Sequence, residues 1–244
     1  MEEQQYDEIN DYYLLLPTFF ADPLESIQSK ENVHHYASVV FPLYLSELYG
    51  PEIIHDIWNR TAASAGWGFL FSIDRAVDSA SQAVCDTSSA DTCYTASLSS
   101  ALRDFAVWNY FTGPYAHQAP EGIGYSERKN YEYFSNETMA RHTTYPGFVD
   151  LNLNPYRPQH NASTYIRFEN LESLVKEDSL LSIYAITETA AGLIWGVAGI
   201  YQSRINPDSH VVVTDTTSGG GIFLESILGP IDARKYRTAT FILT

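Results

Sequence analysis

The stretch of sequence that decides the fold of the first half of the chain is HHYASVVFPLYLSELYGPEIIHDIW, residues 34–58. On both sides of Gly50-Pro51 its apolar residues recur every three or four positions, which is the spacing of one face of an α-helix. Glycine is favoured just after a helix, and proline is favoured at the start of the next one, where an N–H group would have no partner. The stretch therefore predicts two helices that meet at Gly50-Pro51 and pack, antiparallel or at a steep angle, as a helical hairpin.

One residue of the first predicted helix conflicts with a regular helix. Pro42 has no N–H to donate, and its ring clashes with the carbonyl group four residues earlier, at Ser38. We therefore expect a kink near Ser38.

Three other stretches before about residue 115 also follow the helical spacing. Further helices are predicted at residues 3–15, 67–84 and 100–111. Pro17 should end the first of them, and Ser97 or Ser99 should cap the last.

The apolar spacing changes to every second residue from about position 162. Six strands are predicted, at residues 163–171, 179–187, 191–203, 210–216, 221–228 and 237–244. Turn-forming residues separate several of them, at 206–208, 218–221 and 229–230. Short strands with such spacing indicate an antiparallel β-sandwich.

These patterns predict an α+β protein in three parts. Residues 1–115 form a helical subdomain, residues 116–159 a Tyr/Pro/Gly-rich wrapping loop, and residues 160–244 a β-sandwich domain. The expected core residues are Phe41, Leu45, Ile54, Trp58, Leu70, Leu102, Phe105, Trp108, Ile166, Ile183, Trp195, Val212 and Phe223.

The charge of the chain limits its partners. The formal net charge is −16 and the sequence pI is about 4.6. Such a chain is repelled by the phosphates of nucleic acids and by anionic membrane surfaces. It also contains no run of about 18 apolar residues, so we expect no membrane span.

No motif assigns a catalytic residue, a metal ligand or a cofactor. The seven histidines form no H-E-x-x-H, and the sequence has no G-x-S-x-G, P-loop or G-x-G-x-x-G. His34 and His35 are neighbours on a predicted helix and cannot face one ion together, although His55 on the next helix could approach one of them. We therefore expect surface or capping histidines and a chain that is not an enzyme by itself.

Other features indicate a protein that works outside the cell, although MEEQQYDEIN at the start is too polar for a signal peptide. Asn59, Asn136 and Asn161 begin N-x-[ST] triplets and are candidate glycosylation sites, with Asn59 the weakest because it lies in a predicted helix. Cys85 and Cys93 flank the short polar segment DTSSADT and are predicted to form a disulfide.

The sequence also resembles a known family. YASVVFPLYLSELYGPEIIHDIW, then LRDFAVWNYFTGPYA, a Tyr-rich loop and strands are similar to a bacterial family of secreted zincin-type metalloproteases, and more specifically to the region that follows its zinc motif. The resemblance implies an extracellular helical subdomain followed by a sandwich. It implies that the H-E-x-x-H helix would lie upstream of Met1, so no catalytic residue can be assigned in this chain.

Three functions fit these observations. The first is an extracellular, non-catalytic structural or interaction protein, such as a glycosylated fibre or surface subunit, which associates with itself or with another extracellular protein through its apolar terminal strand. The second is a fragment of a zinc metallopeptidase whose catalytic segment lies upstream. The third is a carbohydrate- or surface-binding module, which requires exposed aromatic side chains. We expect the first.

Overall fold

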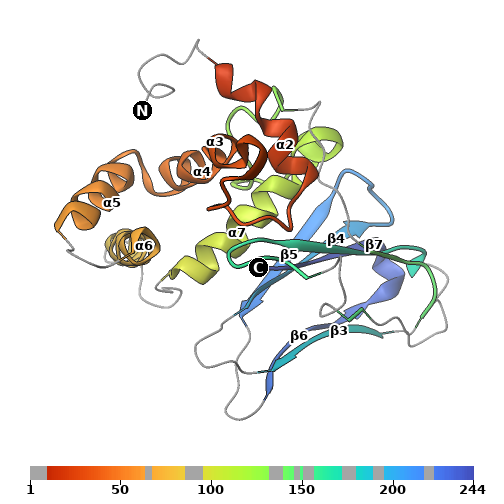
Figure 1. Cartoon of the computed structure of the whole chain (residues 1–244). Coiled ribbons are helices and arrows are strands. Elements are labelled where there is room, and N and C mark those ends of the chain that lie inside the picture. The colour runs from red at the N-terminus through yellow and green to blue at the C-terminus, as the bar shows by residue number, and fades with distance from the viewer. Residues whose placement is uncertain are drawn as a thin grey trace.

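A computed structural model shows helices followed by two sheets, so the α+β prediction is confirmed (Figure 1). The structure describes residues 10–63, 68–85, 96–131, 140–145, 149–150, 157–171, 180–188, 195–216 and 223–244. In Figure 1 the helices, red to yellow, lie together on one side of the molecule and most of the strands lie on the other.

The described part of the first half is mostly helical, and the helices predicted at 67–84 and 100–111 are present, whereas residues 3–9 of the helix predicted at 3–15 lie outside the described residues. The elements of this half are η1 (Asp11–Leu14), α2 (Leu16–Ala21), η2 (Glu31–Val33), α3 (His34–Ala37), α4 (Val40–Tyr49), α5 (Glu52–Ala63), α6 (Phe69–Cys85), α7 (Leu98–Tyr110) and η4 (Gly113–Gln118). The prediction that Pro17 ends a helix is wrong. Pro17 occupies the first turn of α2, where its missing N–H leaves no hydrogen bond unmade.

The helix breaks on both sides of α4 lie where the sequence predicts them. Helix α3 ends at Ala37 and α4 begins at Val40, so the helix is interrupted at the carbonyl group that Pro42 would clash with. Gly50 ends α4 with a φ of 89°, a conformation that residues with a Cβ rarely adopt. The predictions at Pro42 and Gly50 are therefore confirmed.

Helices α2 to α7 bury their apolar faces in one cluster. It contains Phe41, Leu45 and Phe105 of the predicted core, and Ile54 and Leu70 pack at its margin. Trp58 is the exception, because 68% of its surface is exposed. The apolar stripe of α5 that faces the cluster is therefore narrower than predicted. Its buried residues are Ile53 and Ile57.

Helix α7 connects the helical cluster to the sheet. Its N-terminus is fixed by Ser97, which accepts a hydrogen bond from the N–H of Ser100 and so confirms one of the two predicted caps. Phe105 and Trp108 face the helical cluster, whereas Ala106 and Tyr110 face the sheet. A helix that is apolar on both sides in this way is buried between two layers.

All six predicted strands are present, together with a short seventh. The strands are β1 (Ala140–His142), β2 (Thr164–Phe168), β3 (Leu180–Glu188), β4 (Gly196–Ser203), β5 (His210–Thr216), β6 (Phe223–Asp232) and β7 (Tyr236–Leu243), with η6 (Ala233–Lys235) before the last. The turn predicted at Gly229-Pro230 is wrong, because β6 continues through both residues.

The larger sheet has the order β1-β2-β7-β4-β5. Its pairs are antiparallel except β1–β2, which is parallel. Strand β7 lies between β2 and β4 and pairs with both along its length. The prediction that the terminal strand is open to a partner is therefore wrong, since both of its edges are used within the chain.

Both faces of this sheet are covered. Ala198, Ile200 and Ile242 pack against α7 on one face. On the other face, Phe241 and Tyr201 share a cluster with Ile183 of β3 and Leu228 of β6, which form an antiparallel two-stranded sheet. The larger sheet is thus the middle layer between helix α7 and the β3–β6 pair (Figure 1).

The remaining core residues divide into three groups. Leu102, Trp108, Ile166 and Ile183 are buried as predicted, whereas Trp195 and Val212 are half-buried. The side chain of Phe223 lies outside the described residues. In the part of the chain that the structure describes, no helix is both long and apolar enough to cross a membrane. The three-part division of the chain remains a prediction.

Candidate functional site

A loop between α2 and η2, residues 22–30, ties the helices to the segment that leads into β2. We refer to residues 22–30 as the strap. The backbone N–H of Gln159 donates to the carbonyl oxygen of Leu24 at 2.9 Å, and that of Ser163 donates to Pro23 at 2.8 Å. The strap therefore connects two parts of the chain that are more than 130 residues apart.

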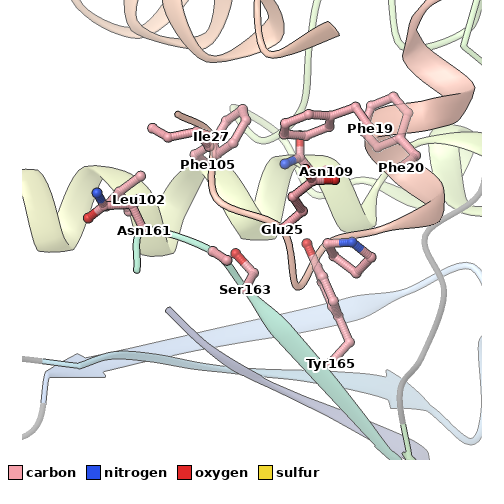
Figure 2. A pocket seen from close by; sticks show the side chains of 12 residues that line it. Phe19, Phe20, Glu25, Ile27, Leu102, Phe105, Asn109, Asn161, Ser163 and Tyr165 are labelled. Carbon is pink, nitrogen blue, oxygen red and sulfur yellow. The ribbon is translucent and has the colours of Figure 1, made fainter. Parts of the chain in front are cut away.

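A small cavity lies beneath the strap (Figure 2). Its volume of about 20 Å³ is close to what one water molecule requires. The aromatic rings of Phe19, Phe20 and Phe105 form one side. Glu25 and Asn109 bring polar groups to it. This cavity is far too small for a substrate of ordinary size.

Next to this cavity, the strap places a carboxylate against a buried imidazole. His34 is 1% exposed, and its Nδ1 lies 3.4 Å from Oε2 of Glu25. Its ring stacks on Phe19 with the centroids 5.0 Å apart. Neither ring nitrogen of His34 has a hydrogen-bond partner among the described residues. Ser29 donates its hydroxyl to the other oxygen of Glu25 and fixes that side chain.

Burial governs the protonation of His34. Removal from water disfavours the charged imidazolium and lowers its pKa, and the positive charge that His35 can carry acts in the same direction. The carboxylates of Glu25 and Asp22 oppose this shift but do not reverse it. At neutral pH the ring is therefore an uncharged group, held in an apolar site beside an acid.

The backbone just before His34 is strained. Val33 has φ 63° and ψ 8°, in the left-handed region, where a β-branched side chain is rarely found. The side chain of Val33 is 43% exposed, so its own packing does not hold this conformation. The conformation instead turns the chain so that the next residue, His34, enters the core.

A second histidine is also buried. His210, at the start of β5, lies among the rings of Tyr110, Phe111 and Tyr115, and burial lowers its pKa. The expectation of surface histidines is therefore wrong for His34 and His210, although it is correct for His35 and His55, which are exposed.

The Tyr-rich loop turns its described tyrosines inward. Tyr125 and Tyr131 are 0% and 1% exposed. The hydroxyl of Tyr125 donates to Oδ1 of Asn109 at 2.5 Å, and the hydroxyls of Tyr131 and Tyr12 lie 2.6 Å apart. Burial raises the pKa of Tyr12 and Tyr131, so both stay protonated as hydrogen-bond donors. These tyrosines stabilise the fold and offer no ring face to a ligand.

Two of the predicted modification sites, Asn59 and Asn161, lie among the described residues. Asn59 is exposed on α5, where its amide contacts the ring of His55. Asn161 is half-buried at the cavity, has a φ of 58°, and donates to Gln28 of the strap at 3.4 Å. Cys85 is the last residue of α6; its side chain lies outside the described residues, as do Asn136 and Cys93.

The described residues contain no group of three or more His, Cys, Asp or Glu side chains that could hold a metal ion. The Glu25–His34 pair can exchange a proton, but the cavity beside it has no room for a substrate. The sequence did not reveal this pair, because the two residues are nine positions apart in a segment without periodicity. Comparison of the chain with protein-family models, curated proteins and solved structures finds no match.

Proposed function

We propose that this chain is an extracellular, non-catalytic interaction protein and that it associates with a second copy of itself through strand β5. The observation that carries the proposal is the exposed outer edge of that strand. No strand among the described residues pairs with this edge of β5. The side chains of Val211 and Val213 in this strand are 44% and 39% exposed. An open apolar strand edge is a template for pairing with another chain.

The hydrogen bonds of β4 indicate which backbone groups of β5 are free to pair with a strand of another chain. Ser203 donates to Ser209 of the adjoining turn, and Gly196 exchanges both of its bonds with Thr244 on the side of β7. Because such bonds alternate along an antiparallel pair, Val211 and Val213 bond to β4. The N–H and C=O groups of Val212 and Thr214 therefore point outward from the sheet.

The sequence of β5 suits pairing with itself. In an antiparallel pair of two β5 strands centred on Val212, Val211 of each copy lies next to Val213 of the other. His210 lies opposite Thr214, and Asp215 lies opposite Ser209. No like charges face one another in this register. The contact has two-fold symmetry, so it forms a closed dimer instead of the fibre that the sequence suggested.

The charge of the whole chain opposes this association. Two copies with a formal net charge of −16 each repel one another at low ionic strength. Salt screens that repulsion, whereas it has little effect on backbone hydrogen bonds and on valine contacts. Dimerisation should therefore strengthen as the salt concentration rises.

The experiment is size-exclusion chromatography with light scattering, at low and high salt. For the chain without substitutions we expect twice the polypeptide mass of 27.4 kDa, plus the mass of any glycan. Thr214→Pro removes an outward N–H and should yield monomer, whereas the matched control Thr214→Val keeps that N–H and should dimerise. A monomer at all salt concentrations, or equal behaviour of the two variants, contradicts the proposal.

The extracellular location rests on the sequons and the cysteine spacing. Intact mass of protein from its natural source tests it. Glycan at Asn59 or Asn161, with Cys85 and Cys93 protected from alkylation, supports secretion. A bare chain with two reactive thiols contradicts it.

Two further proposals follow from the strands and the resemblance. The β3–β6 pair is the second layer of a β-sandwich, which is supported by the packing of Ile183 and Leu228 against Phe241. The relation to the region after the zinc motif of secreted zincin-type metalloproteases is tested by the coding sequence ahead of Met1. An H-E-x-x-H there would favour the alternative of a metallopeptidase.

A further inference from the structure

The surroundings of His34 indicate a regulated contact. A strained backbone at Val33 places an uncharged imidazole, without a hydrogen-bond partner among the described residues, in an apolar site. Each of these features is unfavourable in isolation, since buried polar groups are normally hydrogen-bonded and strained residues cluster at switches. The strap closes this site, with the carboxylate of Glu25 3.4 Å from Nδ1 of His34.

The strap is docked by a small set of hydrogen bonds and by the packing of Ile27 against the helical cluster. Beside the two backbone bonds from Gln159 and Ser163, the N–H of Ser26 donates to the side chain of Gln159 at 3.0 Å, the side chain of Asn161 donates to that of Gln28 at 3.4 Å, and Glu25 approaches His34. A segment held by so few hydrogen bonds over a water-sized cavity opens more readily than the core helices around it.

We propose that the strap is a pH-sensitive latch: protonation of His34 releases residues 22–30 from the segment that precedes β2 and lets the ring of His34 leave its site beside helix α2. In the closed state the imidazole stacks on Phe19 and is uncharged. In the open state it reaches water and accepts a proton. Release relaxes the backbone at Val33 and uncovers the rings of Phe19 and Phe105.

The groups that face His34 set the direction of the switch. The strap presents the carboxylates of Glu25 and Asp22, which favour the charged form of His34. Helix α3, which contains His34, presents His35, which disfavours that charged form. Helix α2 presents the uncharged ring of Phe19, and α7 adds Phe105 behind it. Burial outweighs the two carboxylates, so the closed state binds the proton less tightly than the open state does.

The sign of the pH dependence follows from this difference. Above the ordinary imidazole pKa of about 6.5 neither state is protonated and the latch is closed. As the pH falls below that value, the open state takes up a proton and the closed state does not. The ratio of open to closed molecules then rises by up to about tenfold for each pH unit, until the pKa of the closed state is reached.

Hydrogen exchange of the backbone amides, corrected for the intrinsic effect of pH, tests the latch in the full chain. Between pH 7.0 and pH 5.5 we expect protection of the Gln159 and Ser163 amides to fall several-fold. Amides of α7 and of β7 should keep their protection. The imidazole of His34, followed by NMR, should titrate below 6.5.

Two variants make the result specific. His34→Phe retains the stacking on Phe19 and should abolish the pH dependence, whereas His35→Phe, on the exposed neighbour, should preserve it. Should His34→Phe fail to fold, Glu25→Gln serves instead, because loss of the carboxylate should lower the midpoint of the His34 titration further. Unchanged protection at pH 5.5, the same fall in His34→Phe, or a titration of His34 above 6.5 would overturn the proposal.

Discussion

Replacement of Phe105 by alanine should remove a large part of the stability of the helical half. Phe105 is 3% exposed, and its ring centroid lies 5.0 Å from that of Phe41, 5.6 Å from Tyr44 and 5.9 Å from Phe19. Truncation of a buried phenylalanine costs about 3–5 kcal/mol, which combines lost transfer energy with the cavity that remains. Three ring pairs are lost together at this position, so we expect about 4 kcal/mol.

Urea unfolding, followed by circular dichroism, measures this loss. With a slope near the upper end of the usual range, about 3 kcal/mol per molar urea, the midpoint should fall by more than about 1 M. The matched control is Phe69→Ala on α6, because Phe69 is 51% exposed and its truncation should cost less than about 1 kcal/mol.

Equal losses in the two variants would refute the argument. So would a loss below about 1.5 kcal/mol for Phe105→Ala, since it would mean that the aromatic cluster closes over the missing ring.

Two other predictions concern the sheet contact of α7 and the buried tyrosines. A Cβ at Gly196 would lie 2.7 Å from Cβ of Arg103 and 3.0 Å from the carbonyl oxygen of Ser99, so Gly196→Ala should cost about 1–3 kcal/mol in thermal unfolding. Gly68→Ala, where nothing lies within 4 Å, is its control and should change the melting temperature little. Burial raises the pKa of Tyr13 and Tyr201 to about 12, so the native state retains these protons more tightly than the unfolded state, and the stability they confer is complete below pH 10 and lost as the pH passes 12. Absorbance at 295 nm should show a late-ionising fraction of the 18 tyrosines, and titration of all of them near pH 10 in the folded protein would contradict the prediction.

Elements set by local chemistry could be predicted from the sequence. The interruption before Pro42 and the stop at Gly50 each depend on residues within four positions, and so does the cap of α7, for which the sequence leaves two candidates, Ser97 and Ser99. The strands were recognised because their side chains alternate between two faces. Pro17 was misread because a proline is equally acceptable at the start of a helix and after its end.

Features set by distant contacts could not be predicted in this way. The exposure of Trp58 depends on which side of α5 the other helices cover, and the spacing of apolar residues does not fix the width of the buried stripe. The pairing of β7 between β2 and β4 depends on strand order, which periodicity does not contain. The Glu25–His34 pair is formed by a loop, whose path follows from its anchors at Gln159 and Ser163.

The central position of β7 has a consequence for biosynthesis. Strands β2 and β4 are both made before β7, yet neither borders the other, because β7 fills the place between them. While the ribosome is still extending the chain, the helices can already collapse on one another, but β2 and β4 each expose an apolar edge. The sheet can be assembled only when Tyr236–Leu243 leaves the exit tunnel. A nascent chain stalled before Tyr236 should therefore bind chaperones that recognise extended apolar segments.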